Sequence, residues 1–173
     1  GFDSYLGVPY SNDMSKGELP LVKDNKVVEV DIDQSLLTKR YTDFGIDFIK
    51  GQAGKAPFFL YLAHTMPHIP LAASSNYKGT SKGGLYGDVI EEIDGSVGAI
   101  IHELKNQRLL ENTLVIFTSD NGPWLSYGNH GGSAGVLRGG KFDVWEGGFR
   151  VPAIMSWPGV IPVSYTHLTL PTS

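Results

Sequence analysis

Apolar residues recur at helical spacing in two stretches of the chain. The spacing within residues 34–50 predicts an amphipathic helix that packs one apolar face on a core. That face carries Leu37, Tyr41, Phe44 and Phe48. Asp33 is its expected N-cap and Gly51 its expected end. A second helix is expected over residues 85–109, where the apolar stripe is Ile90, Ile93, Val97, Ile100, Ile101 and Leu104. Its acidic first turn and basic last turn complement the helix dipole.

Shorter apolar runs predict strands between and around these helices. Residues 57–65 are continuously apolar, as expected of a strand that is buried on both faces. Residues 114–118 are β-prone and are followed by Gly122 and Pro123, which end the strand. Short strands are also predicted over 25–31 and 151–157, and loops over 1–24 and 128–148. The order helix, strand, helix, strand indicates an α/β sheet with parallel neighbours.

Composition excludes several classes of protein. The chain has 173 residues, 41% hydrophobic and 18% charged, which is enough for one domain or part of a larger one. Its net charge is -4 and its 14 basic residues are scattered, so nucleic-acid binding is not expected. No apolar run approaches the roughly 20 residues of a membrane span. Without cysteine, the chain has no disulfide and no thiolate metal site.

Two oxygen-bearing side chains follow the strand predicted over 114–118. Asp120 and Asn121 stand at its carboxyl end, where α/β sheets place their ligands. Carboxylate and amide oxygens are hard donors that suit Ca²⁺ or Mg²⁺. The alternative is a strand followed by an Asx-type turn, in which Asp120 only caps the next segment.

Three other polar residues are candidates for a site. His68 lies between two prolines just after the 57–65 run, where it could bind an anion or transfer a proton, or be a surface turn residue. Lys141 follows two glycines, which would let its ammonium approach a ligand oxygen, or it is a solvated loop lysine. Ser11 is by itself an ordinary loop serine, since no Gly-x-Ser-x-Gly elbow surrounds it.

Together these segments resemble the sulfatase family, and within it the arylsulfatase A-like group. The resemblance extends to about Pro162 and is carried by short motifs in a fixed order: Gly1–Gly7 with Pro9–Asp13, Pro57–Leu62, Pro67–Leu71, Thr118–Pro123, Leu137–Lys141 and Trp145–Pro152. It implies a sulfuric-ester hydrolase that cleaves a sulfate monoester with a divalent metal ion. The implied substrate is an aryl sulfate or a sulfated glycan.

The resemblance also implies a fold and a role for each candidate residue. The fold would be α/β, an alkaline-phosphatase-like sandwich around a mixed, largely parallel sheet that is incomplete in this chain. Asp120 and Asn121 would be two ligands of Ca²⁺, with Mg²⁺ as the alternative ion. His68 and Lys141 would be catalytic and would contact the sulfate group and its bridging oxygen, while Ser11 would line the sulfate pocket.

The departures from the family pattern concern the nucleophile. Sulfatases use a formylglycine made from a cysteine in a Cys-x-Pro-Ser-Arg segment, and no cysteine occurs here. We therefore expect residues 1–162 to be part of a sulfatase catalytic domain that is inactive alone. Residues 163–173 fit no preceding pattern, and we expect a non-native or unstructured tail. Export to the periplasm or the extracellular space is expected for the parent protein.

Two other functions remain open from the sequence. One is a phosphodiesterase or phosphonate hydrolase of the same superfamily, which uses a similar metal cradle. The other is a non-catalytic module that binds sulfated glycans through the anion pocket.

Overall fold

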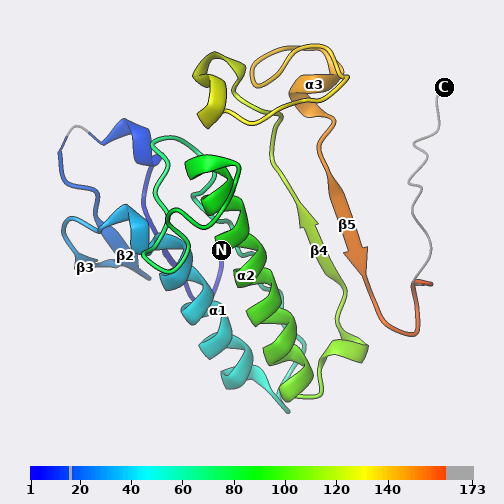
Figure 1. Cartoon of the computed structure of the whole chain (residues 1–173). Helices are drawn as coiled ribbons and strands as arrows, with labels where there is room; N and C mark the ends of the chain where they lie inside the picture. Colours follow the sequence, from blue (N-terminus) through cyan, green and yellow to red (C-terminus); the bar gives the residue numbers. More distant parts are fainter. Residues whose placement is uncertain (16, 163–173) are drawn as a thin grey trace.

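The computed structural model describes residues 1–15 and 17–162, so the tail expected over 163–173 lies outside the described residues. The N-terminal part is a small antiparallel sheet of β1 (Leu6–Gly7), β2 (Leu21–Lys23) and β3 (Lys26–Glu29). Two long helices follow, and then a hairpin of β4 (Val115–Thr118) and β5 (Ala153–Ser156) with a cluster of loops at one end (Figure 1). The described chain is therefore a mixed α/β structure.

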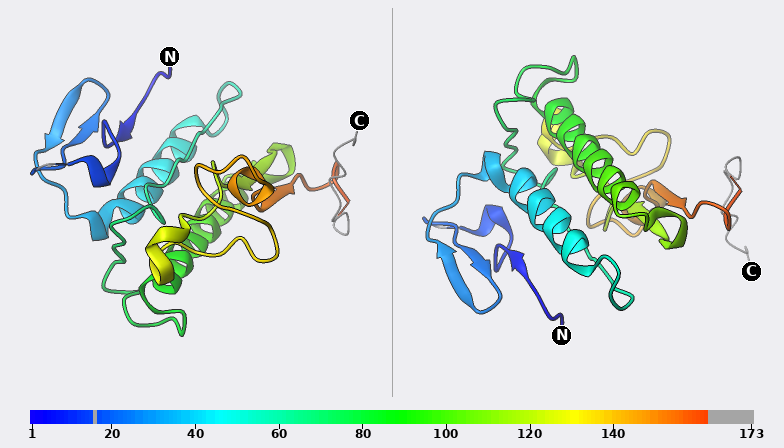
Figure 2. Two further views of the ribbon diagram at one scale, coloured as in Figure 1. Left: turned by 90° about the horizontal axis from the view of Figure 1, so that it is seen from above. Right: turned by 90° about the horizontal axis from the view of Figure 1, so that it is seen from below.

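The two long helices confirm the helical periodicity of the sequence. They are α1 (Leu37–Gln52) and α2 (Gly84–Asn106), which lie side by side in all views (Figure 2). Asp33 accepts a hydrogen bond from the Ser35 amide and so caps the 3-10 turn η2 (Gln34–Leu36) that leads into α1. In the described part of the chain, no helix is long and apolar enough to span a bilayer.

The strand predictions are partly wrong. β3, β4 and β5 all fall within the predicted ranges, but residues 57–65 contain no strand. Its side chains nevertheless alternate: Leu60 and Leu62 pack beside the helices, whereas Phe59 and Tyr61 are 72% and 69% exposed. Apolar composition thus identified a core-facing segment, but a strand also needs a backbone partner, and the described residues provide none.

The predicted parallel pairing and the predicted N-terminal loop are both corrected. β4 and β5 pair antiparallel, with Val115 opposite Ser156, and both sheets among the described residues are antiparallel. Residues 1–24 contain β1 and β2 as well as loop, because Leu21 is buried against the start of α1 and holds β2 in place. Strands of two or three residues show too little alternation to be recognised from the sequence.

A line of buried polar groups crosses the interface between α1 and α2. Thr42 of α1 and Ser96 of α2 share a hydrogen bond of 2.6 Å, and the Ser96 hydroxyl also lies 3.0 Å from Nε2 of His64. Nδ1 of His64 is buried without a hydrogen-bond partner in the described structure. Desolvation by burial lowers the pKa of His64 from 6.5 to about 4. This histidine is therefore neutral in the fold at neutral pH.

Candidate anion-binding site

Three segments meet near one end of the β4–β5 pair. They are the turn 66–70, the 3-10 helix η4 (Leu125–His130) with the residues just before it, and the loop that leads to the short helix α3 (Glu146–Phe149). The Lys141 amide donates a 2.8 Å hydrogen bond to the Pro123 carbonyl, and the Gly122 amide donates one of 2.8 Å to the Gly148 carbonyl. These backbone bonds fix the position of Lys141 relative to the segment that follows β4.

Glycines allow this close packing of backbone on backbone. A methyl group on Gly122 would overlap the carbonyl oxygen of Gly147, and one on Gly147 would overlap the carbonyls of Arg138 and Gly139. Both positions are buried against backbone of a facing segment, so only glycine fits them. The glycine-rich composition of 128–148 thus reflects a compact loop cluster.

Two residues that are far apart in the sequence come together in this cluster. Nζ of Lys141 lies 3.0 Å from Nε2 of His68, and the two residues are 73 positions apart. His68 belongs to the turn in which the Met66–Pro67 and Ile69–Pro70 peptide bonds are both cis. Both side chains are half-buried. The structure thus joins the two residues that the sequence nominated for contact with sulfate.

The hydrogen bonds of His68 define its protonation state in this arrangement. Nδ1 lies 2.7 Å from the Ile69 carbonyl, which can only accept, so Nδ1 carries a proton. Nε2 faces the Lys141 ammonium, which can only donate. The imidazole is therefore neutral, with its lone pair directed at Lys141. A protonated His68 would need Lys141 to turn toward another acceptor.

Aromatic rings surround the Lys141 ammonium. It lies 4.6 Å from the ring centroid of Trp124 and 5.4 Å from that of Phe142. The Trp124 ring also lies 5.6 Å from the His68 ring and 4.7 Å from that of Tyr127. Aromatic faces attract a cation, so the nearer ring, that of Trp124, helps to hold the ammonium in place. None of the three aromatic residues was singled out from the sequence.

Ser11 reaches the same region through Asp13. A hydrogen bond from Ser11, with the positive charges that His68 and Lys141 can carry, lowers the pKa of the Asp13 carboxyl, and desolvation opposes this only partly. An exposed carboxylate near the Lys141 ammonium would balance its charge when no ligand is bound. Asp13 was missed as a site residue, because nothing in its local sequence distinguishes it from another loop aspartate.

Asp120 and Asn121 lie directly before the loop segment that holds Lys141. Asp120 is exposed and Asn121 is half-buried. The Asn121 amide nitrogen donates a 2.9 Å hydrogen bond to the Gly122 carbonyl, which leaves the side-chain oxygen free to bind a cation. These donors suit a hard cation in kind, but Ca²⁺ takes six to eight oxygens. Among the described residues no group of three or more His, Cys, Asp or Glu could hold a metal ion.

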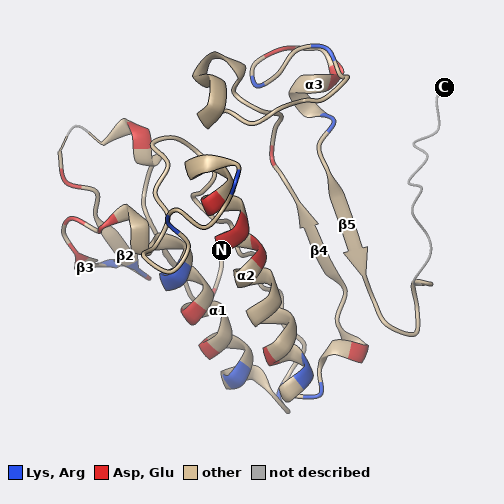
Figure 3. Ribbon diagram, viewed as in Figure 1, with Lys and Arg blue, Asp and Glu red and all other residues tan. Residues whose placement is uncertain are grey.

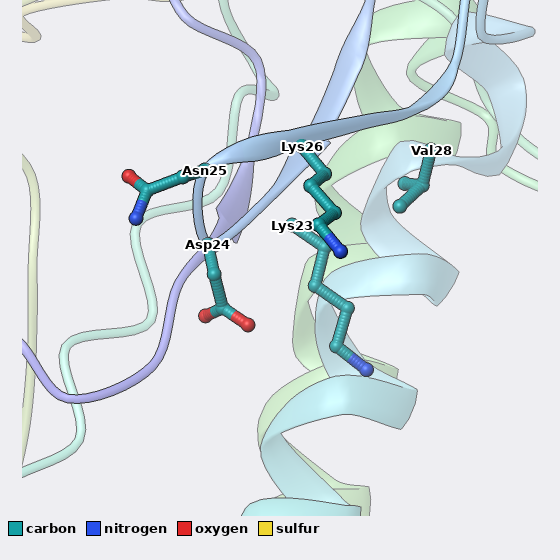
Figure 4. Close-up of a pocket in the computed structure, with 5 residues that line it drawn as sticks. All are labelled: Lys23, Asp24, Asn25, Lys26 and Val28. Carbon is teal, nitrogen blue, oxygen red and sulfur yellow. The ribbon is translucent and has the colours of Figure 1, made fainter.

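Two hollows lie away from this cluster. One, of about 270 Å³, is at the β2–β3 turn, where Figure 4 shows Lys23 and Lys26 on the same side of the hairpin. Its Asp24 accepts a hydrogen bond from the Tyr5 amide. The other lies between α1 and α2 and includes Thr42 and Ser96 in its lining. In the view of Figure 3, acidic and basic residues are interspersed along the helices and loops.

The described chain is a mixed α/β structure in which an ammonium and an imidazole meet within a cluster of loops. The family model described as Sulfatase matches residues 1–170. N-acetylgalactosamine-6-sulfatase of Canis lupus familiaris is 42% identical over 179 residues, with 94% of this chain and 34% of the relative covered. Arylsulfatase A of Bos taurus is 35% identical, with 96% of this chain and 37% of the relative covered.

Solved structures give the same result. PsFucS1 sulfatase from Pseudoalteromonas sp. has a TM-score of 0.73 at 34% identity, over 82% of this chain and 30% of that one. Ps i-CgsB in complex with k-i-k-neocarrahexaose has a TM-score of 0.72 at 33% identity, over 83% of this chain and 32% of that one. The chain belongs to the sulfatase family. It spans about a third of the length of these relatives.

Proposed function

We propose that this chain forms the leaving-group side of a sulfatase active site, at which a sulfate monoester and water are converted to an alcohol and sulfate. The contact of 3.0 Å between Nζ of Lys141 and Nε2 of His68 carries the proposal. A sulfate ester needs positive charge at its non-bridging oxygens and a proton at the oxygen that leaves. An ammonium beside an imidazole supplies both groups at one place.

The two side chains divide this work. The Lys141 ammonium binds the sulfate oxygens, and it exchanges its hydrogen bond with His68 for one with the substrate. Nε2 of His68 is then free to take up a proton from solvent and to donate it to the bridging oxygen as the bond between that oxygen and sulfur breaks. In the net reaction, the oxygen of the water consumed replaces the bridging oxygen on sulfur. The Nδ1–H bond to the Ile69 carbonyl keeps the ring oriented during this transfer. Ser11 lines the pocket beside Asp13.

Asp120 and Asn121 are proposed as two oxygen ligands of a divalent cation, Ca²⁺ or Mg²⁺. When bound, the cation would offset negative charge on the sulfate oxygens. The sequence contains no cysteine, so a formylglycine cannot form within these 173 residues. We also propose that the described elements are part of an alkaline-phosphatase-like sandwich.

The names of the relatives suggest the class of ester. Several are N-acetylgalactosamine-6-sulfatases, and others are a steryl-sulfatase and arylsulfatases. One structural neighbour was solved with a neocarrahexaose. We propose a sulfate ester of a sugar as the substrate.

Hydrolysis by the complete polypeptide encoded by the gene tests the proposal. Release of p-nitrophenol should be faster from p-nitrophenyl sulfate than from p-nitrophenyl phosphate or its diester. Lys141→Met should lower kcat for the sulfate by about 100-fold or more, as loss of one oxyanion donor does in other enzymes. Lys82→Met, a change at an exposed lysine just before α2, is the matched control and should leave the rate unchanged. Faster cleavage of a phosphate ester, or full activity of Lys141→Met, would contradict the proposal.

A further inference from the structure

The aromatic residues beside Lys141 neither bind the sulfate oxygens nor transfer a proton in the proposed chemistry. Trp124, Tyr127 and Phe142, here called the aromatic wall, form a connected group in which Trp124 lies 4.7 Å from Tyr127 and 5.5 Å from Phe142 between ring centroids. Both contacts are edge-to-face, at 71° and 87°. Tyr127 comes from η4 and Phe142 from the loop before α3, so two separate segments place their rings around one indole.

Phe142 is unfavourable for folding in two respects. Its side chain is 79% exposed, so it contributes little by burial. Its φ is +75°, a backbone conformation that a bulky residue adopts only with strain. Residues held in such conformations concentrate at ligand-binding sites, where the surrounding structure enforces them. An exposed ring on strained backbone, next to the Lys141 ammonium, is therefore best explained by a ligand that covers the ring.

The position of the wall determines which part of a ligand it meets. The Lys141 ammonium lies within 5.4 Å of the ring centroids of both Trp124 and Phe142. When Lys141 and His68 hold the sulfate group, the carbon skeleton that carries the sulfate lies within contact distance of these rings. An inorganic oxyanion needs no such surface. A ring with an apolar C–H face does, because it can lie flat on an aromatic side chain.

We propose that the aromatic wall binds the sugar ring of the sulfate ester, with the sulfate on Lys141 and His68 and the C–H face of a hexopyranose against Phe142 and Trp124. The inference rests on the proposed function and adds a subsite for the alcohol part of the substrate. Tyr127 packs edge-on against Trp124 and fixes the orientation of the indole ring, so it acts as a positioning residue. This subsite would select esters of cyclic alcohols over esters of linear ones.

Binding measured by ¹H–¹⁵N NMR on the protein tests the subsite, with the indole N–H of Trp124 as the reporter. The probes are N-acetylgalactosamine 6-sulfate, p-nitrophenyl sulfate, a linear alkyl sulfate and inorganic sulfate. The sugar sulfate should shift the Trp124 signal more than inorganic sulfate does. Phe142→Ala and Phe142→Leu should weaken binding of the sugar sulfate about three- to tenfold, the range expected for one aromatic contact. The affinity for inorganic sulfate should be unchanged. Phe142→Tyr should bind as the unaltered protein does.

Phe149→Ala is the matched control, because Phe149 is also an exposed phenylalanine of the loop cluster, at 62% exposure. It should leave every affinity unchanged. Equal binding of the sugar sulfate by Phe142→Ala and the unaltered protein would overturn the subsite while inorganic sulfate still binds. A loss that is larger for p-nitrophenyl sulfate than for the sugar would also overturn the assignment to sugar. If the unaltered protein binds none of the four anions, the proposed function fails, and the subsite with it.

Discussion

Acidification should weaken the fold through His64, the buried histidine between the two long helices. The pKa of His64 is about 4 in the folded protein, against the ordinary 6.5 in the unfolded chain, because burial disfavours the charged ring. Below pH 6.5 the unfolded chain therefore binds a proton that the folded chain does not. The folded state loses stability as the pH falls from 6.5 toward 4, and the loss is complete below that range.

The size of the effect follows from the same two values. A tenfold change in proton affinity corresponds to about 1.4 kcal/mol. The difference between the two pKa values of His64 therefore lowers the free energy of unfolding by about 3 kcal/mol once the pH is below both. At pH 4.5 most of it, about 2.5 kcal/mol, should already be lost. This is a large part of the stability of a domain of this size. Aspartates with lowered pKa, such as Asp33 and Asp88, act in the same direction, but only as the pH falls below about 3.8.

Urea unfolding followed by circular dichroism at pH 7.0 and pH 4.5 measures the loss. His64→Gln keeps a polar group near Ser96 but cannot be charged, so the variant should lose about 2.5 kcal/mol less than the unaltered protein over this interval. His102→Gln, an exposed histidine of α2, is the control and should lose as much as the unaltered protein. Equal losses for His64→Gln and the unaltered protein would refute the reasoning, as would an NMR titration midpoint near 6.5 for the His64 ring.

Three further results are expected. Gly122→Ala should destabilise the protein by about 2 kcal/mol or more in urea unfolding, because the added methyl group would overlap backbone. Gly98→Ala in α2 has open space around the added methyl group and should stabilise the protein by about 0.5–1 kcal/mol. Asp120→Ala should weaken Ca²⁺ binding in calorimetry at least tenfold, whereas Asp94→Ala should not; equal affinities would remove Asp120 from the metal site. Ser96→Ala should cost about 1–3 kcal/mol in unfolding, because Thr42 and His64 lose a buried partner; an unchanged midpoint would contradict this.

The sequence predicted those features that depend on local pattern. The two helices follow from apolar spacing, and β4 and β5 follow from short β-prone runs. Pairing could not be predicted in the same way, because the direction of β5 relative to β4 depends on the path of the loop cluster between them. Residues 57–65 show the same limit: their apolar residues do face the helices, but a strand exists only where another backbone lies alongside.

The candidate site shows a similar division. His68 and Lys141 were nominated by their motifs, and the structure brings them together. The aromatic wall was missed, since Trp124, Tyr127 and Phe142 have no common spacing and meet only through the fold of the loops. The strain at Phe142 is a property of its φ angle, which the sequence does not reveal. Glycines at 139 and 140 were the one local sign that the chain must turn tightly there.

An NMR titration with sodium sulfate at constant ionic strength tests the anion site most directly. The ring signals of His68 and the side-chain signals of Lys141 should shift together and saturate with one affinity, and sodium chloride should not reproduce the change. The lysines of the β2–β3 hairpin, Lys23 and Lys26, provide the internal comparison, since they form a second group of positive charge. Shifts confined to Lys23 and Lys26, with His68 and Lys141 unmoved, would contradict the account.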